Sequence, residues 1–280
     1  MGRVELAGRL SHVLWLGGMS GVGKTTAARA IARRYDVRLY SLDSRTYEHA
    51  AALPVETRTP DEIWVDSTAE ALADWFEDMA RARFPLVVAD LLEIEDAAPI
   101  IVDGPQVLPE LVAPLLRSPA QALYVFARAE LHRQLVTERG SLTDSQTRDP
   151  DRARENRLRR DEVLVERLRA EAPNHDLPIA QVADVTETKP LVEQHFAPFL
   201  SAWAAVGDHG DFVARRRDEN DARLRQWRLY ANDVPDAAEG EIDLACECQI
   251  EGCTKLVRIP LADAEAVRAA ALRLLSPGHS

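Results

Sequence analysis

Short apolar runs alternate with helix-like segments along the first two thirds of the chain. The apolar runs have the length and composition of buried strands in a parallel sheet, and the segments between them carry apolar residues three or four positions apart. The predicted strands are residues 12–17, 37–41, 99–103, 121–126 and 178–182, and the predicted helices include 26–35, 67–79, 108–116 and 189–203. This alternation predicts one α/β domain over residues 1–205.

Residues 84–94 fit the pattern of a strand and also that of a helix. Their first half is a short apolar run like a strand, but the apolar positions of the whole stretch keep helical spacing. Pro85 suits the first turn of a helix and Asp90 would interrupt a buried strand, so we favour a second helix. A capping box of Ser67 and Glu70 is expected to open the helix before it.

Two other segments lack the regular pattern. Residues 47–66 show little periodicity and are interrupted by proline, so we expect a mobile substrate-side segment there. Nine arginines lie between residues 139 and 169, after a polar start at 140–149. Most of them are expected on a solvated helix face, but the segment 139–170 also fits a lid that closes over phosphates, with Arg157 and Arg160 as candidate catalytic cations.

The turn after the first strand carries the clearest chemical pattern. Residues 18–25 read Gly-Met-Ser-Gly-Val-Gly-Lys-Thr, which fits G-x-x-x-x-G-K-[ST] between a strand and a helix. Such a loop aims backbone N–H groups at phosphate oxygens, its lysine reaches the β- and γ-phosphates, and its threonine binds Mg²⁺. The predicted ATP-binding residues are Gly18, Ser20, Gly21, Val22, Gly23, Lys24, Thr25, Thr26 and Asp103, with Thr25 and Asp103 holding Mg²⁺ and Lys24 catalytic.

Two acidic residues end predicted strands at the edge where open α/β sheets bind ligands. Asp103 follows an apolar strand and precedes Gly104, as in a Walker B strand that holds Mg²⁺. Asp43 ends the second strand and could accept a proton from an acceptor hydroxyl, although a helix N-cap is the alternative role. Arg45 could bind an anionic acceptor, or lie on the surface.

The order of these elements resembles the P-loop kinases of nucleotides and small molecules, a group with adenylate kinase, shikimate kinase and chloramphenicol phosphotransferase. The resemblance covers roughly residues 10–200. It implies a three-layer α/β/α fold with a five-stranded parallel sheet in the order 2-3-1-4-5.

Two details of the resemblance concern site residues. Asp43 and Ser44 look like the position where chloramphenicol phosphotransferase-like enzymes keep an aspartate near the acceptor hydroxyl. The Asp103-Gly-Pro turn resembles the Asp-Gly-Phe-Pro turn of nucleotide monophosphate kinases. Residues 44–97, the expected acceptor side, show no nucleotide monophosphate or shikimate signature, so the acceptor stays open.

The tail, residues 206–280, begins with a linker at 207–211 and a charged helix at 212–230. It carries all three cysteines of the chain, followed by a strand at 254–259 and a helix at 262–275. Cysteines this dense in a reducing compartment are typical of a metal site, although reduced structural thiols are the alternative. A tetrahedral Zn²⁺ needs four ligands, and we predict a structural, zinc-ribbon-like site made by Cys246, Cys248, Cys253 and His279.

Charge and composition argue against several classes of protein. A net charge of −12 argues against nonspecific nucleic-acid binding. No apolar run is long enough to cross a membrane, and the start of the sequence lacks a secretory pattern, so we expect a cytoplasmic protein. A small-molecule acceptor is the expected partner, and a homodimer is one assembly we consider.

The leading hypothesis is an ATP-dependent phosphotransferase that acts on a hydroxyl of a small molecule, such as a metabolite or an antibiotic. A nucleotide kinase and an NTP-hydrolysing regulatory ATPase with a partner-binding tail are the alternatives. Gly104 stands beside Asp103 where ATPases usually carry a hydrolytic glutamate, which favours transfer.

Overall fold

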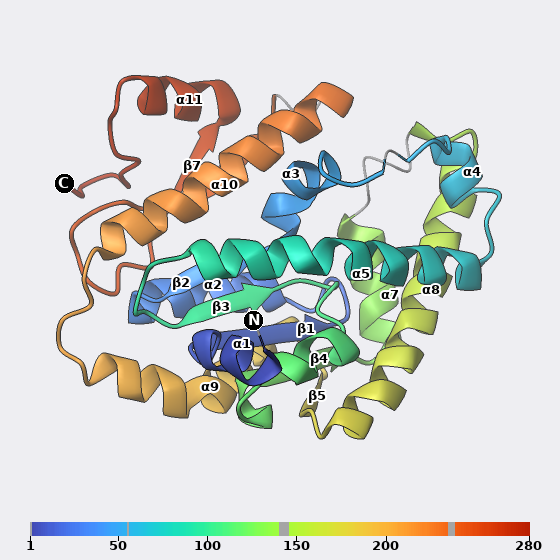
Figure 1. Ribbon diagram of the computed structural model, residues 1–280. Helices are drawn as coiled ribbons and strands as arrows, with labels where there is room; N and C mark the ends of the chain where they lie inside the picture. Colours follow the sequence, from blue (N-terminus) through green and yellow to red (C-terminus); the bar gives the residue numbers. More distant parts are fainter. Residues whose placement is uncertain (1, 55, 140–145, 235–238) are drawn as a thin grey trace.

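All five predicted strands form one parallel sheet in the order β2-β3-β1-β4-β5 (Figure 1). The computed structural model describes residues 2–54, 56–139, 146–234 and 239–280. The strands are β1 (Val13–Gly18), β2 (Arg38–Ser41), β3 (Ile100–Asp103), β4 (Ala122–Ala127) and β5 (Ile179–Val182). The predicted P-loop fold and strand order are therefore confirmed.

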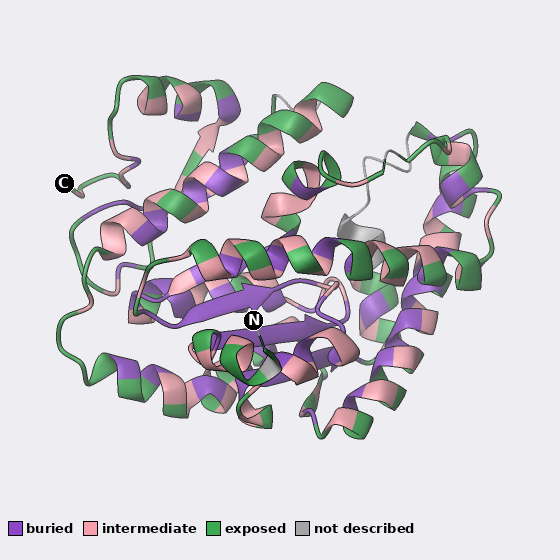
Figure 2. Ribbon diagram, in the orientation of Figure 1, coloured by how far each residue is buried: buried purple, intermediate pink, exposed green. Residues whose placement is uncertain are grey.

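Helices cover both faces of this sheet. In Figure 1, α1 and α5 lie in front of it and α2 lies behind, where α2 packs on α9. The helices of this part are α1 (Arg3–Arg9), α2 (Lys24–Tyr35), α3 (Thr46–Ala50), α4 (Pro60–Trp64), α5 (Ala69–Glu93), α6 (Pro109–Val112), α7 (Ala129–Arg139), α8 (Pro150–Glu171) and α9 (Thr188–Ala204). Strands β1, β3 and β4 are wholly buried and β2 nearly so, as Figure 2 shows, because a sheet covered on both faces has no solvated side. The edge strand β5 is partly exposed, with Ile179 at 40%.

The acceptor-side helices differ from the prediction. Residues 69–93 form one continuous helix, α5, with Pro85 inside it. Its N-cap is Thr68, whose Oγ1 accepts a hydrogen bond from the Ala71 N–H at 3.2 Å. The Ser67 hydroxyl instead donates to the Glu62 carbonyl at 2.8 Å. The expected capping box of Ser67 and Glu70 is therefore wrong, and Thr68 caps the helix without a carboxylate partner three residues on. Residues 47–66 include the short helices α3 and α4 rather than lacking structure.

The tail forms a small unit with its own apolar cluster. It consists of α10 (Phe212–Asp233), the antiparallel pair β6 (Glu241–Ala245) and β7 (Leu256–Pro260), and α11 (Leu261–Ala269). Side chains such as Leu224, Ile242 and Leu261 pack together in this cluster. Helix α10 also contacts β2, α3 and the 3₁₀ turn η1 (Leu42–Arg45), so the tail is joined to the α/β domain along one side of the sheet (Figure 1).

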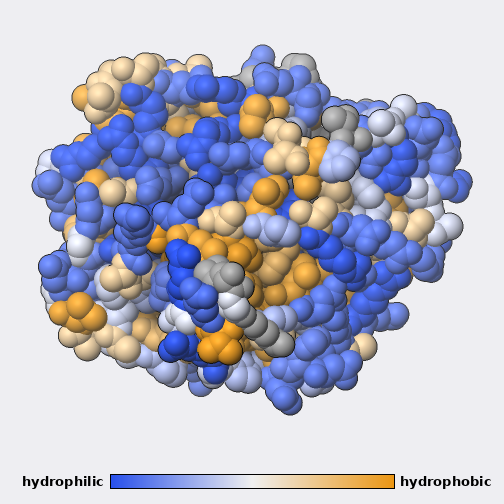
Figure 3. Space-filling model, viewed as in Figure 1, coloured by the Kyte–Doolittle hydropathy of each residue, from blue (hydrophilic) through white to orange (hydrophobic). Residues whose placement is uncertain are grey.

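The visible surface is uneven in polarity. Figure 3 shows a mostly hydrophilic face, with hydrophobic side chains gathered between α5 and α1. Among the described residues, no helix is long and apolar enough to cross a membrane.

Candidate nucleotide site and acceptor side

The glycine-rich loop connects β1 to α2 as the sequence predicted. Gly18 has φ of +106°, and a Cβ there would lie 2.2 Å from the Val125 carbonyl oxygen, so a side chain is excluded. Lys24 begins α2 and is 5% exposed. Its Nζ donates to the Gly18 carbonyl at 3.1 Å and to the Met19 carbonyl, which holds the ammonium group inside the loop.

Another helix braces the same loop from outside. Thr188 at the start of α9 is fully buried and donates from Oγ1 to the Val22 carbonyl at 2.6 Å. No local pattern in the sequence indicates this contact, because it joins positions 166 residues apart. The brace fixes the backbone whose N–H groups are expected to bind phosphate.

Thr25 and Asp103 meet at the carboxyl edge of the sheet. The Thr25 hydroxyl donates to Asp103 Oδ2 at 2.6 Å, and Asp103 is 0% exposed. Burial, with an added contribution from the nearby Asp43 charge, raises the pKa of Asp103 to about 6. Asp103 Oδ1 has no hydrogen-bond partner among the described residues. A hydroxyl beside a buried carboxylate with a free oxygen fits the oxygen ligands that Mg²⁺ requires.

Asp43 lies in η1, directly after β2, and its side chain is exposed. Ser41, two residues before it, is the register partner of Asp103, so Asp43 follows β2 at the sheet edge where Asp103 ends β3. Asp43 thus shares this edge with the Thr25–Asp103 pair and is open to a second ligand.

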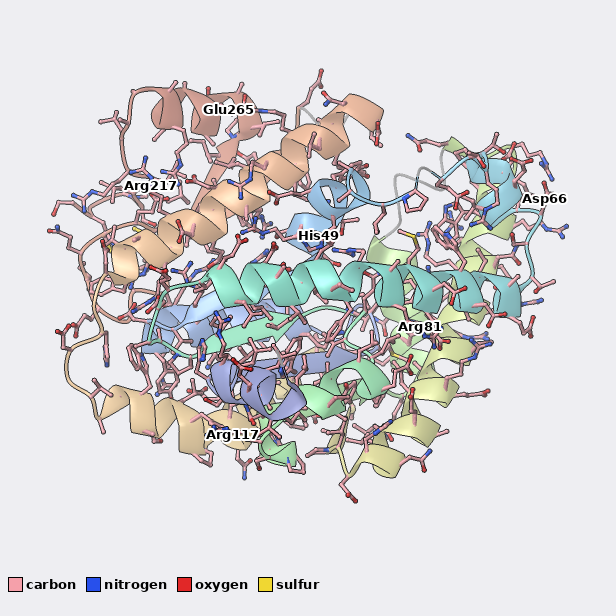
Figure 4. All side chains as sticks on the ribbon, in the orientation of Figure 1. His49, Asp66, Arg81, Arg117, Arg217 and Glu265 are labelled. Carbon is pink, nitrogen blue, oxygen red and sulfur yellow. The ribbon has the colours of Figure 1, made fainter. Side chains whose placement is uncertain are left out.

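A buried polar chain behind η1 was missed by the sequence reasoning. Arg83 of α5 is 3% exposed and donates to the Leu42 carbonyl at 2.9 Å and to Gln106 Oε1. Its Nη2 also lies 3.5 Å from Nδ1 of His49, whose Nε2 is 3.1 Å from Asp90 Oδ2. Figure 4 shows His49 between α3 and α5. These contacts join helices far apart in sequence, so no local motif predicts them. The available signal was a charged residue, Arg83, on an otherwise apolar helix face.

The remaining predicted cations have partners away from the loop. Arg45 pairs with Glu48 at 2.8 Å and lies over the Tyr40 ring. Arg160 donates to Asp161 Oδ1 at 2.6 Å, and both Arg157 and Arg160 lie over the ring of Trp64. In this structure the two arginines join α8 to Trp64 of α4.

Further contacts hold the predicted lid against the acceptor side. Arg152 Nε donates to the Val65 carbonyl at 3.0 Å, and Arg167 pairs with Asp74 at 2.8 Å. Arg148 pairs with Asp66, which Figure 4 places beside α4. Residues 140–145, the polar start of the predicted lid, lie outside the described residues.

The predicted metal ligands converge in the tail. The ligand atoms of Cys246, Cys248, Cys253 and His279 all lie within 4.8 Å of one another. His279 Nδ1 is 3.3 Å from the Cys248 sulfur, 3.5 Å from that of Cys246 and 3.6 Å from that of Cys253. Three thiols around one imidazole nitrogen form a donor set suited to tetrahedral Zn²⁺.

Comparisons with known proteins agree with the nucleotide-binding core. The model of the family described as ATPase family associated with various cellular activities (AAA) matches residues 14–101, which run from β1 into β3. No curated protein matched the sequence. The match and the loop geometry support a P-loop core that uses ATP, either for phosphoryl transfer or for hydrolysis.

Two solved structures resemble the chain distantly. An uncharacterised protein from Eubacterium ventriosum shares 16% identity with a TM-score of 0.38, over 66% of this chain and 98% of that chain. A sugar kinase from Janibacter sp. shares 16% identity with a TM-score of 0.35, over 71% of this chain and 99% of that chain. At these scores the similarity carries no argument about activity.

Proposed function

We propose that the protein is an ATP-dependent phosphotransferase that moves the γ-phosphoryl group of ATP to a hydroxyl of a small molecule. The observation that carries the proposal is the position of Asp43, an exposed carboxylate that follows β2 at the sheet edge where the buried Thr25–Asp103 pair lies. Transfer requires a metal-bound triphosphate and a proton acceptor for the attacking hydroxyl, and this edge of the sheet brings both sets of residues together.

Each residue has a defined part in this proposal. Lys24 leaves the loop carbonyls and binds the β- and γ-phosphates, while Thr25 and Asp103 hold Mg²⁺, which neutralises charge on the phosphates when bound. Asp43 accepts the proton of the acceptor hydroxyl as its oxygen attacks the γ-phosphorus and ADP leaves. Arg157 and Arg160 lie over the ring of Trp64, and their catalytic role stays a prediction.

The test is acceptor-dependent formation of ADP together with a phosphorylated product detected by mass spectrometry. Lys24→Ala should abolish ATP binding, and Asp43→Asn should lower kcat about 100- to 10,000-fold with little change in ATP affinity. Asp263→Asn, an exposed aspartate on α11, is the matched control and should leave both unchanged. ADP formation that needs no acceptor would instead identify a hydrolysing ATPase, and a nucleoside monophosphate acceptor would identify a nucleotide kinase.

We also propose that the cluster of three cysteines and His279 binds a structural Zn²⁺. The cluster supplies four ligands and leaves no position for a catalytic water, and a module this small gains stability from a metal. Metal analysis of the purified chain should find one zinc per molecule and none after Cys248→Ser. Absence of zinc from the unmodified chain would leave the three residues as reduced structural thiols.

A further inference from the structure

The segment that carries Asp43 is held between two helices. Residues 42–50 form the turn η1 and the short helix α3, which follow β2 at the edge of the sheet. In Figure 1, α3 lies between α5 and α10, and both helices contact it. From the α5 side, Arg83 donates to the Leu42 carbonyl directly before Asp43. The position of Asp43 therefore also depends on the contact that α10 makes from the other side.

The contact from the α10 side centres on Tyr47, four residues after Asp43. The Tyr47 N–H donates to Gln226 Oε1 at 3.1 Å, and its ring centroid lies 6.4 Å from that of Tyr230. Burial and a hydrogen bond with Asp233 raise the pKa of the Tyr47 hydroxyl. Gln226, Tyr230 and Asp233 are spaced by four and three positions, so one face of α10 holds the backbone, the ring and the hydroxyl of a single residue.

Gln226 supplies an acceptor that α3 cannot supply by itself. Tyr47 is in the first turn of α3, where N–H groups have no acceptor within their own helix. The Thr46 N–H directly before it donates to the Asp43 carbonyl, so α3 begins on the backbone of Asp43. The hydrogen bond from Tyr47 to α10 therefore fixes the start of α3 and, through it, the backbone of Asp43.

The first half of α10 is bound to the loop of the Cys/His cluster. Asn220 is fully buried, and its Nδ2 donates to the Ala245 carbonyl at 2.9 Å and to Glu247 Oε1 at 2.7 Å. These two acceptors flank Cys246, a member of the cluster. One continuous helix of 22 residues thus joins the cysteine loop to the segment that carries Asp43.

We propose that the tail positions Asp43, and that docking of α10 on Tyr47 is required for phosphoryl transfer but not for ATP binding. Gln226 is the positioning residue of this contact. The phosphate loop is braced separately, by Thr188 of α9, so ATP affinity should not depend on Gln226. The effect on transfer rests on the proposed phosphotransferase function, whereas the docking contact can be tested without it.

The experiment compares three variants of the full chain. Gln226→Met removes the acceptor oxygen with little change in side-chain length, and Gln226→Glu keeps an oxygen acceptor in its place. Arg228→Met is the matched control, because Arg228 is on the same helix and its ion pair with Glu265 lies at the surface.

Hydrogen exchange with mass spectrometry measures the docking contact directly. Loss of the bond from the Tyr47 N–H should raise amide exchange in residues 42–51 about tenfold in Gln226→Met, with exchange in α2 unchanged. Gln226→Glu should restore protection, and Arg228→Met should not alter it. Exchange in residues 42–51 that stays unchanged in Gln226→Met, or that rises equally over the whole chain, would overturn the positioning role.

Turnover of Mg²⁺-ATP tests the link to Asp43. The probe is water in place of the acceptor hydroxyl, and the slow formation of ADP is measured. Gln226→Met should lower kcat about tenfold with the KM for ATP unchanged, and Gln226→Glu should restore it. In an Asp43→Asn background Gln226→Met should have no further effect, because a residue that acts through Asp43 is not additive with it.

The outcomes separate this inference from the proposed function. Additive losses in the double variant, or a raised KM for ATP in Gln226→Met, would overturn the link between α10 and Asp43. Full turnover in Asp43→Asn would instead overturn the role of Asp43 as proton acceptor, and the exchange measurement alone would then decide whether α10 holds the segment.

Discussion

Arg83 links the acceptor-side helix α5 to the residue that precedes Asp43. Its guanidinium group donates to the Leu42 carbonyl and to Gln106, and burial lowers its pKa while the charge of Asp43 opposes that shift. Arg83 is therefore a positioning residue: it holds the backbone of η1 and so the place of the Asp43 carboxylate.

We predict that Arg83→Met destabilises the protein by about 2–4 kcal/mol, because two buried acceptors lose their donor. Displacement of η1 should lower kcat as well. Arg81→Met is the matched control: Arg81 is on the same helix but its ion pairs are at the surface, so its loss should cost under about 1 kcal/mol. Urea denaturation measures the free energy of unfolding of both variants. Equal losses would show that the buried hydrogen bonds of Arg83 contribute no more than the surface ion pairs of Arg81.

A second residue-scale prediction concerns the carboxyl pair Glu110 and Glu171. Burial and the hydrogen bond with Glu110 raise the pKa of Glu171 to about 7, while the pKa of Glu110 is lowered, so the pair shares one proton near neutrality. A raised pKa means that the folded state binds the proton more tightly than the unfolded chain. The stabilisation is therefore complete at low pH and is lost as the pH rises through about 7.

Raising the pH from 5.5 to 8.5 should accordingly lower the unfolding temperature, and Glu171→Gln should remove part of that dependence. Glu171 is partly exposed, so solvent screening limits the effect to under about 1 kcal/mol, or roughly 2 °C. Differential scanning fluorimetry across the pH range measures it. Parallel pH profiles for the two proteins would contradict the shared proton.

At the scale of the elements, α5 contains an exposed proline in its interior, at Pro85. Proline there removes one helical hydrogen bond, at a cost of up to about 3 kcal/mol. We predict that Pro85→Ala stabilises the protein by about 1–2 kcal/mol, since greater freedom of the unfolded chain offsets part of the gain.

Pro60, in the first turn of α4, is the matched control because its missing N–H has no helical acceptor. Pro60→Ala should therefore bring no gain in denaturation experiments. A loss of stability in Pro85→Ala would mean that the proline-imposed shape of α5 contributes to its packing on α8.

The sequence predicted the elements whose signals are local. The five strands and the phosphate loop follow from apolar runs, glycines and charges within a few residues. The density of the three cysteines, with His279 as the only histidine that follows them, led to the four members of the Cys/His cluster. The break expected at Pro85 was wrong, because packing of α5 on the sheet and α8 outweighs the local penalty. Strand β6 was missed although Glu241 to Leu244 alternate polar and apolar side chains.

Contacts between distant segments could not be predicted. Three contacts depend on how separate elements pack: Thr188 with the loop, Arg83 with His49, and α10 with β2. No local pattern specifies such pairs. The sequence therefore predicted the phosphate loop of the candidate site but not the contacts on its proposed acceptor side.

At the scale of the whole molecule, the tail and the phosphate-loop helix share a buried ion pair. Arg216 of α10 pairs with Asp36, the C-cap of α2, and donates to the Cys248 carbonyl at 2.9 Å. The Gly252 N–H donates to the other Asp36 oxygen at 2.7 Å. These bonds connect the cysteine loop to α2, the helix that begins with Lys24. Folding of the tail therefore stabilises the α/β domain, and folding of the α/β domain stabilises the tail.

We therefore predict that, with the proposed Zn²⁺ bound, its removal destabilises the entire chain and not the tail alone. A metal that binds only the folded state adds about 4 kcal/mol at 1,000 times its dissociation constant, so chelation should lower the unfolding temperature by several degrees. Because the Asp36–Arg216 pair joins the two units, calorimetry should show one transition before and after chelation. Cys248→Ser should resemble the chelated protein and should not respond further to chelator. Two separate transitions, with only the smaller one sensitive to chelator, would show that the tail folds independently of the α/β domain.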